Sequence, residues 1–454
     1  MNSKTLFLKT SPLKLFFIAS LPGAIGMLAS ALYQLIDGIF VGQILGNTAF
    51  AALNLAMPLV IINFSLADLI GVGSSVPISI SLGRGENKEA NNIFTCACLM
   101  IFIAGIIIGS ILFFSAPLLI KLMGAKGEFA VFAAEYLRVY ALLSPVTTIV
   151  FAMDNYLRIC GKIRTSMFLN IFMSVISALL EFLFLYVFKW SIGGAALATC
   201  LGMIICSSLA LIPFLKGKMT LSFCRPHFTF KIFRQIIACG SPNFLNNIAG
   251  RLTSIIMNIL LVRFGGENAV SVYGILMYAD GFIQPLLYGM CDSLQPAVGY
   301  NWGAGKFSRV RAIEKCCFAA SFIISFISVF VIYFFPTQIT HMFMHSAGTE
   351  FMSMSVTALS LFSLTYITRW FSFASQSYML AIEKPFFASA ISVSTALLFP
   401  VALIGVLWNF GLTGLWLNFP LTSLLAALLS AFIMLKAREE LNKPDIDLQT
   451  KQIY

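Results

Sequence analysis

Apolar residues along this chain occur in long stretches, separated by short segments rich in glycine, proline and charged residues. Leu15 to Ile36 and Trp190 to Leu215 carry no charge, and the charge-free stretch from Pro385 to Leu435 is long enough for two helices. A helix needs about 20 such residues to cross the hydrocarbon core of a bilayer. With the breaker residues as boundaries, the pattern predicts twelve transmembrane helices, near residues 14–40, 51–82, 93–119, 131–157, 165–188, 191–215, 238–262, 268–301, 312–335, 351–381, 386–408 and 411–435.

The chain also contains an internal repeat. Residues Ser20 to Gly85 align with Gly240 to Gly305 at a constant offset of 220, so that Pro22 matches Pro242 and Gly83 matches Gly303. Six helices in each copy leave both copies in the same orientation, which relates them by an axis along the membrane normal. The fold class we predict is therefore an all-α polytopic membrane protein of two six-helix lobes related by a pseudo-twofold axis.

The repeat sets the expected domain boundaries. Residues 1–215 form an N-lobe and residues 238–436 form a C-lobe. Between them lies a basic cytoplasmic linker, 216–237, and after them a cytoplasmic tail, 437–454, that is surface-bound or disordered. Duplicated halves are a recurring construction of secondary transporters, so transport is the leading hypothesis from the repeat alone.

Composition supports a membrane location. With 59% hydrophobic and 10% charged residues, the chain has too little polar surface for a soluble protein of 454 residues. If the N-terminus is cytoplasmic, the predicted outer segments hold only four basic residues, Lys121, Lys126, Lys189 and Arg263, while most others fall inside. This asymmetry predicts a multi-pass protein of the cell (inner) membrane with both termini cytoplasmic. It also explains the net charge of +11 without nucleic acid, because inner loops face anionic lipid.

Cysteine and histidine give little support for a metalloenzyme. The ten cysteines show no disulfide or zinc spacing. His341 and His345 are four residues apart near Glu350, but two histidines do not complete a metal site. We therefore expect no enzymatic activity and no cofactor other than a coupling ion.

Charged residues inside the predicted spans are the functional candidates, because burying them in a bilayer is costly. These residues are Asp37, Asp68, Glu181, Asp280 and Asp292, with Arg251 and Arg369 as basic counterparts. Such a set can carry protons, hold a metal cation, pair internally or attract a cationic substrate.

Two of the acids are candidates for cation coupling. Asp37 has Met257 as its repeat counterpart, so the acid is present in one lobe only; the alternative is an acid that touches water at an outer helix end. Glu181 has Ser177 one turn earlier on the same helix face, and Thr199 follows on the next helix. Carboxylates and hydroxyls suit a small hard cation, and a carboxylate also suits proton exchange. A structural hydrogen bond is the alternative for Glu181.

The other charged residues are assigned to a substrate cavity or a gate. Asp68 precedes a small-residue face, Gly71 to Ser75, that allows close helix packing; hydrogen bonding to nearby groups is its alternative role. Asp280 and Asp292 can instead serve to neutralise Arg251 and Arg369. Aromatic and methionine side chains, which are abundant, can line pockets for varied apolar cations.

Several segments together resemble the multidrug and toxic compound extrusion family, over about Leu15 to Leu435. They are Asp37 to Gly42, Leu45-Gly46, Ala49 to Leu53, Gly71 to Ser79, Leu82-Gly83, Gly193 to Thr199, Gln295-Pro296 and Asn301 to Gly305. The resemblance implies two lobes arranged in a V that open alternately to either side. It also implies export of cationic amphiphiles in exchange for H+ or Na+.

The resemblance assigns roles to individual residues. Asp37 looks like the family's first-helix aspartate, and Glu181 stands at the position of a fifth-helix acid that is usually Asp. Thr199 looks like a hydroxyl of the same cation site, which implies Na+ or H+ at Asp37, Glu181 and Thr199. Ser177 stands where many relatives carry Asn. One subgroup couples through acids in the seventh and tenth helices, where this chain has Arg251 and Arg369, so it resembles bacterial members that couple in the N-lobe.

The sequence thus predicts a secondary active multidrug exporter that works by alternating access as a monomer in the lipid bilayer. Its nearest rival is a flippase for lipid-linked saccharides, but a polyanionic headgroup favours cavity Arg and Lys, and here five acids outnumber two arginines. A polytopic membrane enzyme and a nontransporting receptor or scaffold are further alternatives. The choice between H+ and Na+ stays open.

Overall fold

The computed structural model describes residues 3–344 and 348–446, which are helical apart from short connections. The elements are α1 (Ser3–Lys9), α2 (Pro12–Phe40), η1 (Val41–Leu45), α3 (Asn47–Arg84), α4 (Asn87–Leu122), α5 (Gly127–Thr147), α6 (Ile149–Ile159), α7 (Ile163–Phe182), η2 (Leu183–Val187), α8 (Ile192–Leu215), α9 (Phe230–Gly303), α10 (Phe307–Phe334), α11 (Pro336–Phe343), α12 (Thr349–Ser363), α13 (Thr365–Ala381), α14 (Pro385–Val393), η3 (Ser394–Leu398), α15 (Phe399–Val406), η4 (Trp408–Phe410), α16 (Gly411–Lys436) and α17 (Arg438–Leu441).

Ten of the described helical segments are long and apolar enough to cross a membrane, and the bent pair α12–α13 adds an eleventh. The 74-residue α9 is far longer than one span, since about 20 residues suffice. Its direction changes at Gly266, whose φ of 63° and ψ of −156° break the helix at a position where glycine has no steric penalty. With α9 counted as two spans, the described chain has the twelve predicted helices of a multi-pass membrane protein.

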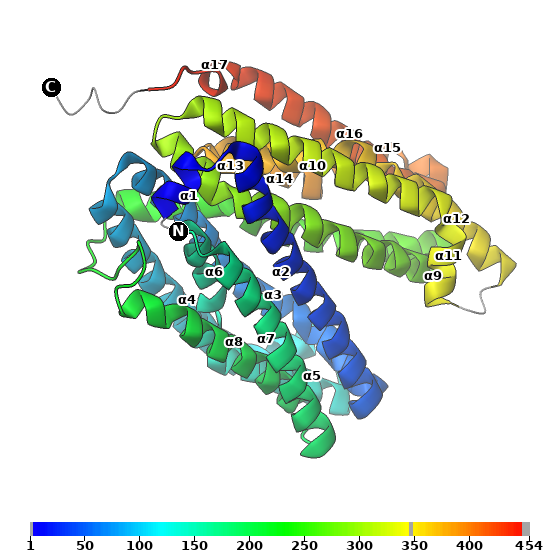
Figure 1. Ribbon diagram of the computed structural model, residues 1–454. Helices are drawn as coiled ribbons and strands as arrows, with labels where there is room; N and C mark the ends of the chain where they lie inside the picture. The colour runs from blue at the N-terminus through cyan, green and yellow to red at the C-terminus, as the bar shows by residue number, and fades with distance from the viewer. Residues whose placement is uncertain (1–2, 345–347, 447–454) are drawn as a thin grey trace.

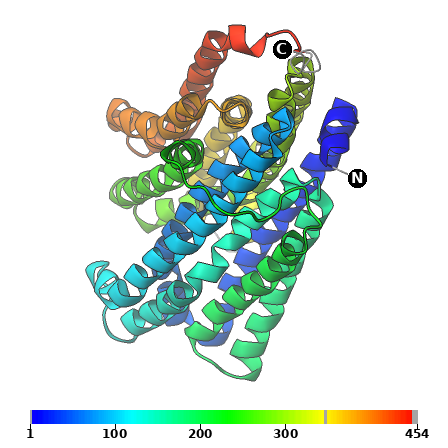
Figure 2. The ribbon, with the colours of Figure 1, turned by 90° about the vertical axis from the view of Figure 1, so that its left-hand side faces the viewer.

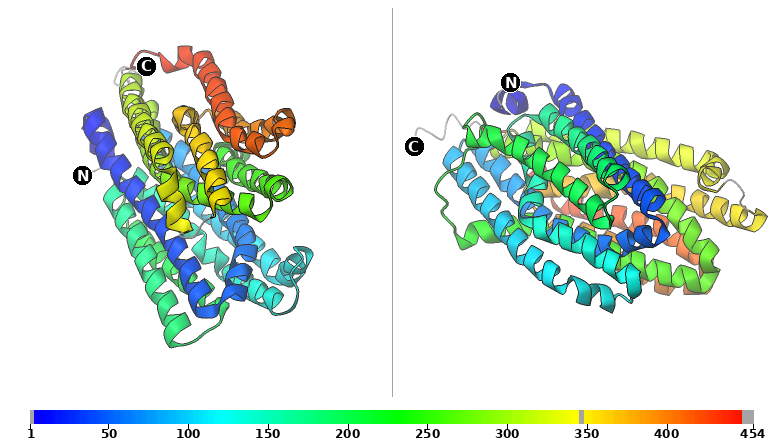
Figure 3. Two further views of the ribbon diagram at one scale, coloured as in Figure 1. Left: turned by 90° about the vertical axis from the view of Figure 1, so that its right-hand side faces the viewer. Right: turned by 90° about the horizontal axis from the view of Figure 1, so that it is seen from below.

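The helices form two bundles that share one end of the molecule and diverge toward the other. Figure 1 shows α2 to α8 running away from the end that carries both termini, at an angle to α9 to α16. A large apolar core at this joined end contains residues of both bundles, among them Ile80 of α3 and Tyr300 of α9. Two smaller cores, one in each bundle, occupy the opposite, open end, which Figure 3 shows in its left view.

Glycines allow the two lobes to approach closely at the joined end. A Cβ added at Gly83 would lie 2.2 Å from Tyr300 O, and one added at Gly303 would lie 2.1 Å from Ile80 O. Both contacts pair α3 with α9, and each becomes the other when 220 is added to or subtracted from its residue numbers. The predicted pseudo-twofold relation between the lobes is therefore present in the packing as well as in the sequence.

The connections at the joined end refine the expected boundaries. Figure 2 looks onto this end, where the linker (green) crosses from α8 to α9. Because α9 begins at Phe230, residues 230–237 are helical and are not part of the extended linker. Part of the predicted tail is bound to the C-lobe, since Ile446 N donates to Gly305 O at 3.0 Å; residues 447–454 lie outside the described residues.

Candidate functional site

Asp37 and Glu181 meet inside the N-lobe. Asp37 lies in the last turns of α2 and Glu181 near the end of α7, and their carboxyl groups are within hydrogen-bonding reach of each other. Asp37 is 4% exposed and Glu181 is fully buried. The alternative that Asp37 touches water at a helix end is therefore wrong.

Hydroxyl groups surround this carboxyl pair. Tyr33, one turn before Asp37 on α2, shares a 2.6 Å hydrogen bond with the Thr199 hydroxyl of α8. The Tyr33 hydroxyl also donates to Glu181 Oε2 at 3.5 Å, and Tyr140 of α5 packs beside the group. Three helices thus bring two carboxyls and two hydroxyls together, and Thr199 stands with the two acids as the resemblance implied.

Both acids are followed by π-helical segments. Val41–Leu45 follows α2 directly and Leu183–Val187 follows α7, and the two segments contact each other. π-Helical turns occur frequently at functional sites. The contact between these two segments, each next to one of the acids, is therefore in keeping with a functional site in this region.

Several oxygens of this cluster have no hydrogen-bond partner within the described residues: Asp37 Oδ1, Glu181 Oε1 and Ser177 Oγ. Ser177 is buried one turn from Glu181, but its Oγ faces Gly202 of α8, where an added Cβ would lie 2.0 Å away. Two buried carboxylates in contact repel each other strongly. Either one of them takes up a proton, or a cation binds between them. The donor set of carboxylate and hydroxyl oxygens fits a hard cation equally well.

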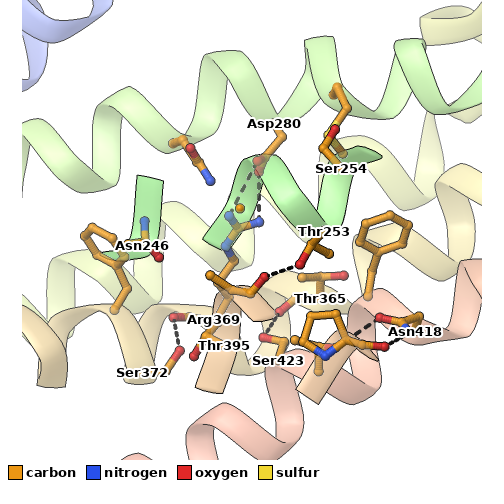
Figure 4. Close-up of a pocket in the computed structure, with 18 of the residues that line it drawn as sticks. Asn246, Thr253, Ser254, Asp280, Thr365, Arg369, Ser372, Thr395, Asn418 and Ser423 are labelled. Carbon is orange, nitrogen blue, oxygen red and sulfur yellow. Dashed lines mark hydrogen bonds and ion pairs between the residues drawn. The ribbon is translucent and has the colours of Figure 1, made fainter. Parts of the chain in front are cut away.

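The C-lobe holds a different cavity in the region related to the N-lobe acid pair by the repeat. It has a volume of about 240 Å³ and is lined mainly by α9, α13, the η3 region and α16 (Figure 4). Met257 and Thr253, the repeat counterparts of Asp37 and Tyr33, both line it. The duplicated position therefore has a similar place in each lobe, but it carries an acid only in the N-lobe.

Asp280 and Arg369 form the ionic group of this cavity. Arg369 Nη1 donates to Asp280 Oδ1 at 2.9 Å and Nη2 to Oδ2 at 3.4 Å. The Tyr366 hydroxyl donates to the same carboxylate, and the guanidinium lies over the Tyr366 ring. The pairing of an embedded acid with Arg369 is thus present in the structure.

The remaining candidates lie apart from both clusters. Asp68 of α3 and Asp292 of α9 are near each other and near Arg158, toward the joined end, and Asp292 accepts a hydrogen bond from Gln295 at 2.9 Å. Arg251 is exposed on α9, and its charge acts on Tyr273 of the C-lobe cavity. His345 lies outside the described residues, and the structure as described contains no cluster of three or more metal-ligating side chains.

Sequence reasoning missed the aromatic hydroxyls and one ion pair. The i, i+4 spacing of Tyr33 and Asp37 was a usable signal that both face the same way. Arg158 contacts Asp154 at 2.5 Å, and Ser166 and Asn170 of α7 bond to the same aspartate. Arg158 lies one residue beyond the predicted span 131–157, but its i, i+4 spacing from Asp154 indicates an ion pair on one helix.

Comparisons with known proteins agree with this architecture. The sequence pattern of the MatE family matches residues 22–183 and 242–404, two segments that again begin 220 residues apart. The Multidrug export protein MepA of Staphylococcus saprophyticus is 24% identical over 97% of this chain and 98% of its own length. The protein of the same name from Staphylococcus haemolyticus is 23% identical over 96% of each chain.

Solved structures show the same fold. A crystal structure of a MATE protein in complex with MaL6 superposes with a TM-score of 0.91, at 22% identity, over 98% of this chain and 100% of that chain. An outward-facing multidrug resistance MATE family transporter of the MOP superfamily superposes with a TM-score of 0.90, at 22% identity, over 96% and 98%. Because the family pattern covers both halves and the fold matches throughout, this chain belongs to the MatE family.

Proposed function

We propose that this protein is a secondary active multidrug exporter that exchanges cationic amphiphilic compounds for inward H+ or Na+. Its relatives over nearly the full length are named multidrug export proteins, which supports export of small molecules. The observation that carries the coupling proposal is the buried contact between Asp37 and Glu181. The two acids lie side by side, so that each has the other as its charged neighbour. Such a pair has a strong physical requirement for a proton or cation.

The architecture supports alternating access. The basic loops predicted to face the cytoplasm belong to the joined end, so the V of the structure corresponds to an outward-open state. The site in each lobe lies beside the core of the open end, where the two bundles separate. Rocking of one lobe against the other around these sites would expose them to the other side.

A coupling cycle follows from the N-lobe geometry. In the outward-open state a proton or Na+ binds between Asp37 and Glu181 and removes their mutual repulsion. The π-helical ends of α2 and α7 then repack, and a substrate that was held by the negative charge leaves to the outside. In the inward-open state the ion dissociates, and the restored charge attracts the next cationic substrate.

Ethidium accumulation in efflux-deficient bacteria tests this function. Wild type, Asp37→Asn and Asp445→Asn are expressed at matched membrane levels, and the proton and sodium gradients are collapsed separately. Asp445 lies on the exposed tail, bound to Ser308, so its variant controls for the Asp-to-Asn change itself.

We expect wild type and Asp445→Asn to lower ethidium accumulation and Asp37→Asn to lose this effect; the gradient whose collapse stops efflux identifies the ion. Normal efflux by Asp37→Asn would rule out the coupling role. Absence of efflux by all three proteins would contradict multidrug export and favour a narrow substrate range or a lipid flippase.

A further inference from the structure

The cavity of the C-lobe combines an apolar wall with many hydrogen-bonding groups. Met257, Met277, Phe362 and Phe373 supply flexible or aromatic surface, which suits apolar groups of varied shape. The polar lining includes Asn246, Ser254, Gln284 and Thr422. A ligand with one polar end and one apolar end matches this lining better than a wholly apolar one.

The ion pair makes the charged part of the cavity neutral. Arg369 and Asp280 are 23% and 13% exposed, so both are largely shielded from solvent. Because Arg369 already neutralises Asp280, a plain cation bound at Asp280 would leave the site with a net positive charge. A plain anion bound at Arg369 would leave a net negative charge, and an uncompensated charge is costly in a low-dielectric site.

The pair nevertheless retains capacity for further hydrogen bonds. A guanidinium has five N–H donors, and two of those of Arg369 reach Asp280. Each carboxylate oxygen can accept more than one bond. A ligand carrying both an ammonium and a carboxylate can therefore bind alongside the pair, antiparallel to it, without breaking it.

Two hydroxyl groups that line the cavity are available for further hydrogen bonds. Thr365 Oγ1 and Thr395 Oγ1 have no hydrogen-bond partner within the described residues, and Thr365 is 4% exposed. Both are labelled on the cavity wall in Figure 4. Thr395 belongs to the π-helical segment η3, whose Ala396 carbonyl accepts a hydrogen bond from Thr253 at 2.5 Å. Buried polar atoms are normally hydrogen-bonded, so these two hydroxyls can supply further hydrogen bonds to a polar ligand in the cavity.

We propose that the C-lobe cavity binds the head group of zwitterionic amphiphiles, with the ligand's ammonium at Asp280 and its carboxylate at Arg369. The apolar remainder of the ligand lies against the methionine and aromatic wall. A zwitterion adds no net charge to the site, so it avoids the cost that excludes a plain cation or anion.

This inference rests on the proposed export function, since it names a substrate class for the same transporter at a second site. It adds a difference between the lobes: the N-lobe acid pair takes a cation, whereas the C-lobe acid–base pair takes a net-neutral dipolar head. Binding can be measured without transport, which keeps the two proposals separable.

The test uses three fluorescent forms of one compound with the purified full chain in detergent. Nε-dansyl-lysine is a zwitterion at its head group, its methyl ester is a cation, and its Nα-acetyl derivative is an anion. For wild type and for the control variant Asp445→Asn we expect the zwitterion to bind at least about tenfold more tightly than either derivative, the usual value of one charge-assisted contact. Equal affinity of the three forms for wild type would overturn the proposal.

Variants then assign the preference to the ion pair. Arg369→Gln should weaken zwitterion binding by about tenfold and strengthen binding of the methyl ester, because Asp280 becomes uncompensated. The double variant Asp280→Asn with Arg369→Gln keeps the site neutral, so it can be used if the single variant does not fold. We expect the double variant to bind the three forms with similar affinity. A preference that persists in the double variant would overturn the assignment, whatever the ethidium assay shows for Asp37→Asn.

Discussion

The two lobes have the same fold but different charge arrangements in related regions. In the N-lobe, Asp37 faces a second acid, Glu181, in a cluster of hydroxyl groups. In the C-lobe, the counterpart of Asp37 is Met257, and the acid of that cavity, Asp280, is neutralised by Arg369. Duplication therefore preserved the scaffold while the charged chemistry diverged.

This contrast separates the residues that hold the lobes together from those that distinguish their sites. The close contacts at Gly83 and Gly303 remain equivalent, because any side chain there would collide with a backbone oxygen of the other lobe. No such steric requirement acts on the site residues. We propose that the acid pair of one lobe and the acid–base pair of the other have different tasks in the transport cycle.

The largest effect is expected from removing one member of the acid pair. Glu181→Gln leaves Asp37 without the like charge that creates the demand for a cation, so we expect uphill ethidium efflux to fall by about a hundredfold. Efflux in cells, normalised to membrane level, measures the change. Glu181→Asp preserves the charge and should retain most activity; equal loss in both variants would show that side-chain length and not charge matters.

Alanine substitutions at the two equivalent glycines between the lobes should have equal effects on stability. Gly83→Ala and Gly303→Ala each place a Cβ against the backbone of the other lobe and should each destabilise the arrangement seen in the structure by about 1–3 kcal/mol. In a background without the native cysteines, accessibility of a single cysteine introduced at the joined end reports opening there. Markedly unequal effects of the two substitutions would contradict the symmetric packing.

Breaking the C-lobe ion pair should lower stability moderately. Arg369→Gln leaves a largely shielded carboxylate with only the Tyr366 hydroxyl, and we expect about 1–3 kcal/mol less stability, below the value for a fully buried pair. Thermal unfolding in detergent measures it. The double variant Asp280→Asn with Arg369→Gln should recover most of the loss; a double variant as unstable as the single one would show that packing, and not charge, accounts for it.

The smallest effect is expected at Tyr33. Tyr33→Phe removes the hydroxyl that bonds Thr199 at 2.6 Å and Glu181 at 3.5 Å but keeps the ring. Loss of such bonds should weaken ion-driven efflux by about three- to tenfold. Thr253→Val at the repeat counterpart provides the comparison, because no acid pair lies there. An equal effect on ethidium efflux in both lobes would argue against a special role of the N-lobe hydroxyls.

The fold was predictable because long apolar stretches and in-register breakers determine it. The break at Gly266 divides α9 between the predicted spans 238–262 and 268–301, and at the offset of the repeat Gly266 matches Gly46. The meeting of Asp37, Glu181 and Thr199 was implied by family resemblance. Residue spacing alone could not give it, because contacts between distant helices depend on packing.

Other site features were beyond the sequence for a physical reason. The i, i+4 spacing of Asp154 and Arg158 indicates that they can pair, but not that Ser166 and Asn170 of the next helix bond to the same aspartate. The choice of Asp280, and not Asp292, as the partner of Arg369 depends on which face of α9 turns toward α13. That rotation is fixed by many small packing contacts and not by a local motif.

Reconstituted transport tests the central claim most directly. Purified wild type, Asp37→Asn and Asp445→Asn are placed in liposomes, a proton or sodium gradient is imposed, and movement of ethidium against its own gradient is followed. The account predicts uphill movement by wild type and Asp445→Asn with one of the two gradients and none by Asp37→Asn. Uphill movement by Asp37→Asn at the wild-type rate would contradict it.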